Sequence, residues 1–279
     1  MRKLGLIAGG GRLPVEIADH CERTGRPFHI LRLRGFAGAE LDAYPGETVG
    51  LAELGKCFKS LRRAGCEAIC MAGLVARPDF AKLKPDLRGV RAIPGAIVAA
   101  RRGDDALLRY MLGVFEHEGF AVEGAHEVMS DLTLPAGPLG AVQASADHLA
   151  DIARAHTVVR ELGRLDIGQG AVVCDGLVLA VEAQEGTDAM LARVAELPIA
   201  VRGAPGRPRG VLVKAPKPIQ EERVDLPTIG PGTIERLAQA GLAGVAGEAG
   251  RMIVLEREAV IRLADELGVF VVGLEPPKP

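Results

Sequence analysis

Aromatic side chains are scarce in this sequence, and their scarcity excludes one class of function. Phe, Trp and Tyr make up 3% of the 279 residues, with no Trp and two Tyr, and the formal net charge is −2. Nucleic-acid-binding proteins usually have aromatic stacking platforms and a basic surface. The composition therefore argues against DNA or RNA as a partner.

Long apolar runs and clustered histidines are also missing. No apolar stretch approaches the roughly 18 residues that a membrane-spanning helix needs. The six histidines form no H-x-H or H-E-x-x-H pattern, which argues against a histidine-based metal centre. Neither a G-x-S-x-G elbow nor a G-x-x-x-x-G-K-[ST] loop occurs, which disfavours serine hydrolases and P-loop NTPases.

The five cysteines are odd in number and lack zinc-site spacing. Only Cys66 and Cys70 lie close together in the sequence, as C-x3-C without a histidine at the spacing of a zinc site. We therefore expect buried, reduced thiols, which are typical of a cytoplasmic protein.

The sequence does contain a globular share of apolar residues and an excess of glycine. Apolar residues make up 48% of the chain, charged residues 25%, and glycine occupies 36 positions. A length of 279 residues corresponds to about two domains of ordinary size. Apolar runs alternate with helical patterns along the chain, which predicts an α/β protein.

Residues 1–134 are predicted to form a Rossmann-like domain. The apolar run 3–8 ends in three glycines, is followed by apolar positions at helical spacing, and leads to a second apolar run at 28–33. A helical pattern at 54–64 and an apolar run at 68–72 repeat the arrangement. Such alternation favours a parallel sheet covered by helices.

Residues 146–275 are predicted to form a second α/β domain with a mixed sheet. Residues 135–145 are expected to be the linker, because they contain prolines and glycines and lack the apolar spacing of a helix or a strand. Two apolar runs that flank Asp175-Gly176 indicate an antiparallel hairpin in the second domain. The tail 276–279 is expected to be disordered.

A glycine turn follows the first predicted strand, in Gly9-Gly10-Gly11-Arg12-Leu13. Such a turn offers backbone N–H groups and the positive end of a helix to a phosphate. An NAD motif would need a glycine where Pro14 stands and an acidic residue where the second strand ends in Arg32 and Arg34. NADP stays an alternative, because an arginine could hold its 2′-phosphate. A purely structural role of the glycines in helix–strand packing also stays open.

Carboxylates gather after the second strand of the predicted hairpin, in Glu182-Ala-Gln-Glu185-Gly-Thr187-Asp188. Like charges held close together raise one another's pKa unless a cation joins them. Mg²⁺ needs only one or two carboxylates, so Glu182, Glu185 and Asp188 are candidate ligands. Alternatively, Asp188 or Thr187 caps the following helix and Glu182 is exposed.

The stretch 214–233 combines cations, a carboxylate and many prolines. Its polar candidates are Lys214, Lys217, Gln220, Arg223, Asp225 and Thr228. Prolines reduce the entropy lost when a long loop is held in one shape. Lysine and arginine can neutralise a diphosphate, and a carboxylate can orient water or hold Mg²⁺. These features favour a catalytic loop over a plain linker.

Three blocks of sequence, in this order, resemble the LpxI family of UDP-2,3-diacylglucosamine pyrophosphatases of lipid A biosynthesis. The blocks are Gly5–Pro14, then Gly168-Gln169-Gly-Ala-Val-Val173 with Glu182–Asp188, and finally K-x-x-K-P-x-Q-x-x-R-x-D-L-P-x-x-G-P-x-T over 214–233. The last block is specific, whereas the glycine turn alone is not. The resemblance spans almost the whole chain.

The resemblance implies hydrolysis of UDP-2,3-diacylglucosamine to UMP and 2,3-diacylglucosamine 1-phosphate, with Mg²⁺ or another divalent cation. It also implies two domains that close over the substrate, water directed to the sugar-side phosphorus, and an essential aspartate, here Asp225. Because the substrate carries two acyl chains, we expect a cytoplasmic protein in peripheral contact with the inner membrane.

The predicted roles combine the motifs with the resemblance. The catalytic candidates are Asp225, Lys214, Lys217, Arg223 and Gln220. The substrate-binding candidates are Gly9, Gly10, Gly11, Arg12, Leu13, Gln169, Thr187, Asp188 and Thr228, and the metal candidates are Asp225, Asp188, Glu182 and Glu185. Residues 90–100 are apolar and are expected to form a core strand or to line the space between the domains. An NADP-dependent oxidoreductase and a non-catalytic nucleotide or lipid carrier remain the alternatives.

Overall fold

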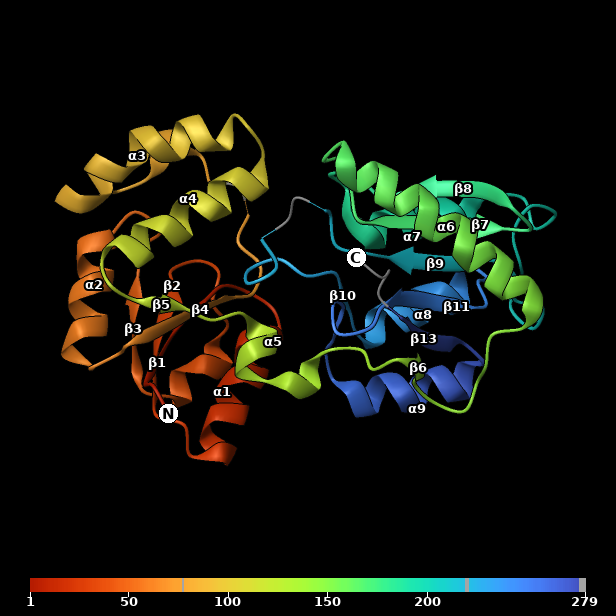
Figure 1. Ribbon diagram of the computed structural model, residues 1–279, viewed down its shortest axis with the longest axis horizontal. Helices are drawn as coiled ribbons and strands as arrows, with labels where there is room; N and C mark the ends of the chain where they lie inside the picture. The colour runs from red at the N-terminus through yellow and green to blue at the C-terminus, as the bar shows by residue number, and fades with distance from the viewer. Residues whose placement is uncertain (77, 219–220, 276–279) are drawn as a thin grey trace. The chain divides into compact units, whose positions relative to one another are not determined.

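The computed structural model describes residues 1–76, 78–218 and 221–275. The chain forms two compact units, Met1–Ser130 and Asp131–Pro279, and both are α/β (Figure 1). The predicted fold class is therefore confirmed. The division falls between Ser130 and Asp131 rather than after residue 134.

The N-terminal unit is built on a parallel sheet with the strand order β3-β2-β1-β4-β5. Its strands are β1 (Leu4–Ala8), β2 (Phe28–Leu33), β3 (Gly46–Val49), β4 (Ala68–Ala72) and β5 (Ala121–Val122). The order reverses at β1, where the next strands, β2 and β4, lie on opposite sides. This reversal is the place where ligands bind in doubly wound sheets.

The helices of this unit enclose a core that contains three phenylalanines. They are α1 (Leu13–Thr24), α2 (Leu54–Arg63), α3 (Leu87–Ala100), α4 (Asp104–His117) and α5 (Ala125–Val128), with short 3-10 turns at Ala39–Ala43 and Phe80–Lys82. A third 3-10 turn, Ser130–Leu132, lies at the division between the two units. The ring centroids of Phe58 and Phe115 are 5.1 Å apart, and Phe120 lies 6.4 Å from each.

Residues 90–100 belong to helix α3, so the expected core strand is wrong. The side chain of Asp86 caps the helix by accepting a hydrogen bond from Gly89 N, at 2.9 Å. The stretch is rich in Ala and Gly, whose small size lets the helix pack closely on α4: a Cβ on Gly95 would lie 2.6 Å from the Tyr110 hydroxyl. The alanines of this stretch favour a helix, whereas its apolar character alone suggested a strand.

The C-terminal unit has a mixed sheet with the order β6-β13-β11-β9-β7-β8. Its strands are β6 (Gly137–Pro138), β7 (Gly170–Cys174), β8 (Leu177–Val181), β9 (Val211–Lys214), β11 (Gly244–Glu248) and β13 (Phe270–Leu274). Strands β9, β11 and β13 are parallel, whereas β6, β7 and β8 pair antiparallel. A separate pair joins β10 (Thr228–Ile229) to β12 (Ile253–Val254).

Helices cover both faces of this sheet. On one face lies α6 (Ala146–Arg164), and on the other lie α7 (Gly186–Glu196), α8 (Pro231–Gln239) and α9 (Arg257–Leu267). Successive side chains of strand β7 point to opposite faces of the sheet. Val172 belongs to the core under α7 and α8, whereas Ala171 and Val173 belong to the core under α6.

The expected linker, 135–145, is part of the C-terminal unit. Gly137 and Pro138 pair with β13 as an edge strand, and the Leu139 amide donates to Val271 O at 2.8 Å. Leu139 is also buried in the core. Proline is tolerated in a sheet where the strand lies at the edge. The prolines and glycines that suggested a linker are therefore explained by an edge strand.

The cysteines agree with the expectation of buried, reduced thiols. All five cysteines are buried and unpaired, and burial raises the pKa of Cys57 and of Cys70 to about 12. Such thiols are poor nucleophiles. None of the helices in the described ranges has the length and apolar character needed to cross a membrane.

Candidate functional site

Polar side chains meet at the carboxyl ends of the parallel strands in the C-terminal unit. Strand β9 ends at Lys214 and β11 ends at Glu248, and the register places Lys214 opposite Gly247. Lys214 also pairs with Gly170 at the start of β7. Ligand sites in open α/β sheets lie at this edge, so these residues are the structural centre of the candidate site.

Lys214 is buried and joins three elements. Its Nζ donates to Thr187 Oγ1 at 2.6 Å and to Thr228 O at 3.3 Å, and it lies 3.9 Å from the Glu182 carboxylate. Thr187 Oγ1 in turn donates to Glu182 Oε1 at 2.8 Å. The predicted residues from the second and third blocks are thus brought together, and Thr187 serves this network rather than capping a helix.

Burial lowers the pKa of Lys214, because the charged ammonium is removed from water. The carboxylates of Glu182, Asp225 and Asp188 act in the opposite direction on the pKa of Lys214. All three therefore lie near enough for electrostatic interaction with the ammonium. The sequence alternative of an exposed Glu182 is wrong, since this residue is 6% exposed.

Two buried side-chain acceptors of this region lack a hydrogen-bond donor within the described ranges. They are Glu182 Oε2 and Gln169 Oε1. Glycines make room for the glutamate, because a Cβ on Gly170 would lie 2.4 Å from Glu182 Oε2 and one on Gly168 would lie 1.9 Å from Glu182 O. Buried acceptors are normally satisfied, so these two atoms have capacity for a donor that a ligand or water supplies.

The loop 215–227 carries the other catalytic candidates. Lys217 Nζ donates to Asp166 Oδ1 at 2.7 Å, and Arg223 Nε donates to Glu221 Oε1 at 2.9 Å. Asp225 is half-buried and lies near the Lys214 ammonium, as described above. Gln220 lies outside the described residues.

The sequence predicted a cluster of carboxylates that could hold a metal ion. In the described part of the chain, no three His, Cys, Asp or Glu side chains lie close enough together to form one. Glu185 pairs with Arg193, and Asp188 pairs with Arg236 at 3.1 Å. The arginine that pairs with Glu185 therefore lies further along α7, and the one that pairs with Asp188 lies on α8.

A buried ion-pair network at the end of β11 was not predicted from the sequence. The Glu248 side chain is 0% exposed, lies 3.0 Å from His156 Nε2 and 3.4 Å from Arg160 Nη1, and pairs with Arg251. Burial by itself raises the pKa of Glu248, but the His156 hydrogen bond and the arginine charges hold that pKa below its usual value.

Arg251 connects this network to the segment that carries Asp225, because it also pairs with Glu222. Glu222 precedes Asp225 by three positions in the sequence. The network thus holds the loop against the edge of the sheet. The sequence signal for it is weak, since the run Gly244–Gly247 contains only Gly, Val and Ala and was not recognised as a strand.

In the N-terminal unit, two amides of the glycine turn are already used. Gly9 N donates to Ala72 O and Gly10 N donates to Leu74 O, each at 2.8 Å. A Cβ on Gly9 would lie 2.7 Å from Leu74 O, so this glycine is required for packing. Any phosphate contact through backbone N–H groups of this turn falls to Gly11, Arg12 and Leu13 at the start of α1.

Arg32, near the end of β2, and Arg34, directly after it, differ in their surroundings. Arg32 is buried and donates to Leu41 O at 2.9 and 2.7 Å. It is therefore a structural residue, and the idea that it holds a 2′-phosphate is not supported. Arg34 is exposed and pairs with Glu53 at 3.3 Å.

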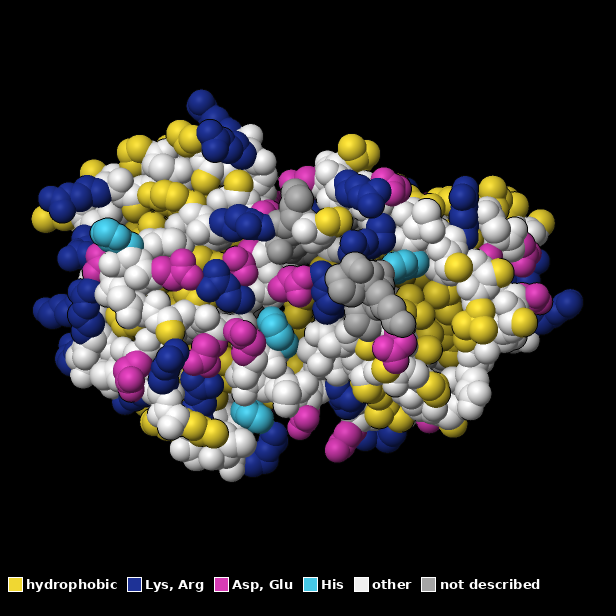
Figure 2. Space-filling view, in the orientation of Figure 1, with side chains coloured by type: hydrophobic (Ala, Val, Ile, Leu, Met, Phe, Trp, Pro, Cys, Tyr) yellow, Lys and Arg dark blue, Asp and Glu magenta, His cyan; other side chains and the backbone are white. Residues whose placement is uncertain are grey.

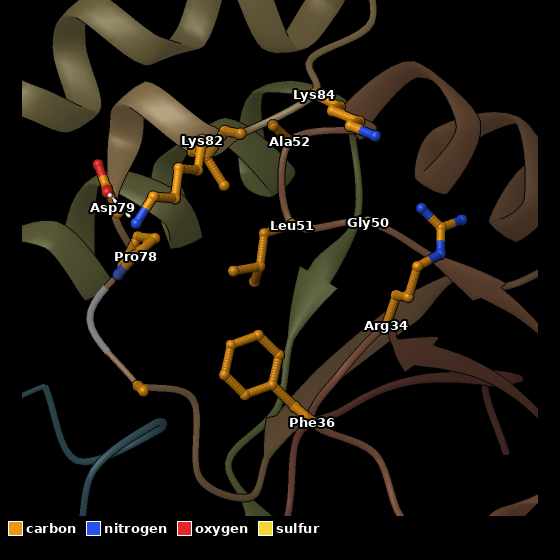
Figure 3. Close-up of a pocket in the computed structure, with 11 residues that line it drawn as sticks. Arg34, Phe36, Gly50, Leu51, Ala52, Pro78, Asp79, Lys82 and Lys84 are labelled. Atoms are coloured by element: carbon orange, nitrogen blue, oxygen red, sulfur yellow. Dashed lines mark ion pairs between the residues drawn. The ribbon is translucent and has the colours of Figure 1, made fainter.

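An open pocket of about 350 Å³ lies at the carboxyl edge of the N-terminal sheet. Loops that follow β2, β3 and β4 line it, and its members include Arg34, Phe36, Leu51, Pro78 and Lys82. Figure 3 shows the Phe36 ring and the Leu51 side chain pointing into the pocket. The pocket thus combines an apolar wall with cations at its side.

The fold and the two sheet edges define a two-domain α/β protein with a buried lysine–carboxylate cluster in one unit and a Rossmann-like sheet in the other. Residues 3–132 match the family model described as the LpxI N-terminal domain, and residues 135–272 match the LpxI C-terminal domain. A curated relative from Caulobacter vibrioides, named UDP-2,3-diacylglucosamine pyrophosphatase LpxI, is 66% identical over 276 residues, which is 99% of each chain. The chain therefore belongs to the LpxI family.

Proposed function

We propose that this protein hydrolyses the diphosphate bond of UDP-2,3-diacylglucosamine, giving UMP and 2,3-diacylglucosamine 1-phosphate. The observation that carries the proposal is the 66% identity, over 99% of both chains, to a relative named for this activity. The match includes both units, so it is not a likeness of nucleotide-binding folds alone. Because the substrate carries two acyl chains, the protein works in peripheral contact with the inner membrane from the cytoplasmic side.

Neutralising the diphosphate is the first task of the chemistry, because its negative oxygens repel an incoming water. Lys217 and Arg223 are suited to this task from the loop 215–227. Each is oriented by a carboxylate, Asp166 for Lys217 and Glu221 for Arg223. A cation held in this way loses less entropy when it binds phosphate.

Asp225 is the proposed orienting group for the attacking water. A carboxylate can accept a proton or a hydrogen bond from water at the moment of attack on the sugar-side phosphorus. Leu226 and Pro227, which follow it, are buried and fix the end of the loop. The charge of Lys214 lies near this carboxylate.

Lys214 acts as a positioning residue in this proposal. Its bonds to Thr187 and Thr228 connect α7 to the end of the catalytic loop. The unsatisfied acceptors Glu182 Oε2 and Gln169 Oε1 suit donors on the sugar, such as a hydroxyl or the N–H of the acylated amine.

A divalent cation, most simply Mg²⁺, belongs to the proposal. Asp225 would hold it together with oxygens of the substrate diphosphate, as the small number of available carboxylates requires. When bound, the cation supplies positive charge that stabilises the diphosphate during hydrolysis.

The N-terminal unit is proposed to bind the UDP part. The amides of Gly11, Arg12 and Leu13 suit a phosphate oxygen. The pocket beside Phe36 and Arg34 offers a ring for stacking and a cation for the phosphates.

Release of UMP from UDP-2,3-diacylglucosamine tests the proposal directly. We expect UMP release with Mg²⁺, its loss in EDTA, and its recovery when Mg²⁺ is added back. We also expect UDP to raise the melting temperature and NADP to leave it unchanged. Protection by NADP alone would favour an oxidoreductase, and binding without UMP release would favour a carrier.

A further inference from the structure

Helix α3 presents an apolar face to solvent. Leu87, Val90 and Val98 are 83%, 54% and 53% exposed, and Pro94 between them is also exposed. Spacings of three and four residues place these side chains on one face of the helix. Exposed apolar side chains gathered in this way mark an interaction surface more often than scattered ones do.

The opposite face of α3 is already occupied by its own unit. Gly89, Ala96 and Ala100 are buried there, and the Tyr110 hydroxyl of α4 donates to Ala92 O at 2.9 Å. A Cβ on Gly89 would lie 1.9 Å from Ala52 O. These contacts fix the rotation of the helix, so the outward apolar face cannot be turned into the core.

The charges on this face have one sign. The helix contains no Asp or Glu between Leu87 and Ala100. Arg91 lies on the exposed face, and Arg101 and Arg102 follow at its end, all three exposed. Helical spacing places Arg91 and Arg101 beside the apolar side chains. Among the described residues, none of these three guanidinium groups takes part in a side-chain ion pair or hydrogen bond.

We propose that this surface, the α3 outer face (Leu87, Val90, Arg91, Pro94, Val98, Arg101 and Arg102), binds the surface of an anionic lipid bilayer. Figure 2 shows apolar and basic side chains next to one another in the region of α3. Apolar side chains on an interfacial helix enter the headgroup boundary, and arginines bind the lipid phosphates. The excess of unpaired positive charge selects an anionic lipid surface over an uncharged one.

Lipid binding by the α3 outer face depends on this helix alone. That such binding brings the enzyme to its diacylated substrate rests on the proposed function. The two statements therefore need separate measurements.

Vesicle sedimentation tests the binding. We would compare vesicles of phosphatidylcholine alone with vesicles in which phosphatidylglycerol replaces part of the phosphatidylcholine. The unmodified protein should bind the second kind more tightly. Each basic residue near an anionic surface contributes a factor of roughly five, so Arg91→Gln with Arg101→Gln should weaken binding roughly 25-fold. Val90→Gln with Val98→Gln should also weaken it.

The C-terminal unit offers matched control variants. Leu149→Gln changes a similarly exposed apolar residue of α6, which is 54% exposed. Arg262→Gln changes an exposed arginine of α9. Both controls should bind vesicles as the unmodified protein does. Equal binding to the two kinds of vesicle, or unchanged binding of the α3 variants, would overturn the proposal.

Two further readouts separate the remaining outcomes. If Val90→Gln with Val98→Gln converts a dimer to a monomer in sedimentation and vesicle binding is absent, the surface is an interface between copies and the lipid proposal fails. If UMP release in detergent micelles is absent in the unmodified protein, the proposed function fails while the vesicle result stands. The α3 variants should keep their rate in micelles and lose rate only on vesicles.

Discussion

The carboxyl-end edges of the two sheets, one in each unit, are built in contrasting ways. In the C-terminal unit, neighbouring strands end in Lys214 and Glu248, which are both buried and held by several polar partners. In the N-terminal unit, three strands are followed directly by Gly9, Gly50 and Gly73, and an open pocket lies among the loops.

This difference points to different tasks. Burying charge costs free energy, but a buried and well-partnered cluster holds its members in fixed positions, as catalysis requires. An open edge with small residues admits a ligand that brings its own charges. We therefore expect changes at the C-terminal edge to affect turnover and stability, and changes at the N-terminal edge to affect nucleotide binding.

Glu248→Ala should have the largest effect on stability. It would leave His156 and the cations of Arg160 and Arg251 without their buried partner, and we expect a loss of about 3–5 kcal/mol in the free energy of unfolding. Because Arg251 also holds the loop of Asp225, kcat should fall more than KM rises. Urea denaturation and steady-state kinetics measure the two effects, and unchanged stability would show that the network is dispensable.

The same residue makes stability depend on pH. The pKa of Glu248 is lower in the folded protein than its ordinary value of 4.5, so its contribution is complete above that value and is lost as the pH falls through the folded pKa. The melting temperature of the unmodified protein should therefore drop in acid. Glu248→Gln should flatten this drop, and an identical acid profile in the variant would exclude Glu248 as its source.

Gly9→Ala should produce a smaller loss, in the N-terminal unit. Its Cβ would lie 2.7 Å from Leu74 O, a backbone atom that cannot move cheaply, and we expect a loss of about 1–3 kcal/mol. Gly11→Ala meets no atom within 4 Å, but its φ of +86° favours glycine and should cost about 1 kcal/mol. Denaturation midpoints compare the two, and a neutral Gly9→Ala would remove its packing role.

Glu185→Gln should have the smallest effect. Its carboxylate pairs with Arg193 rather than facing Lys214. We expect kcat, and the Mg²⁺ concentration that gives half-maximal activity, to stay at the values of the unmodified protein. A marked rise in the required Mg²⁺ concentration would return Glu185 to the metal site.

The strands and helices with clear periodicity could be predicted from the sequence. The strand at 68–72 and the hairpin around Asp175-Gly176 occur as expected, because apolar runs and a turn pair define them locally. Strand β11 was missed because Gly244 and Gly247 interrupt its apolar pattern. Both glycines are required by neighbours in space, since a Cβ on either would lie 2.4 Å from another side chain.

The candidate site, like the fold, could be predicted only where a local sequence pattern defines it. Lys214 and Glu182 could be predicted from their sequence motifs, and the structure brings their side chains together. In the separate network at the end of β11, His156 and Arg160 lie far from Glu248 in the sequence, and no local pattern connects them with it. The roles of Glu185 and Asp188 depend on the arginines nearby, which the spacing of acidic residues does not reveal.

A paired kinetic measurement on Asp225→Asn and Arg34→Gln tests the contrast between the two edges most directly. We predict that Asp225→Asn lowers kcat by roughly 10²- to 10⁴-fold and leaves the affinity for UDP, measured without Mg²⁺, unchanged. Arg34→Gln should weaken UDP binding by roughly tenfold and leave kcat at saturation unchanged. Near-normal turnover of Asp225→Asn, or a loss of kcat in Arg34→Gln without weaker UDP binding, would contradict the assignment of chemistry to the C-terminal edge.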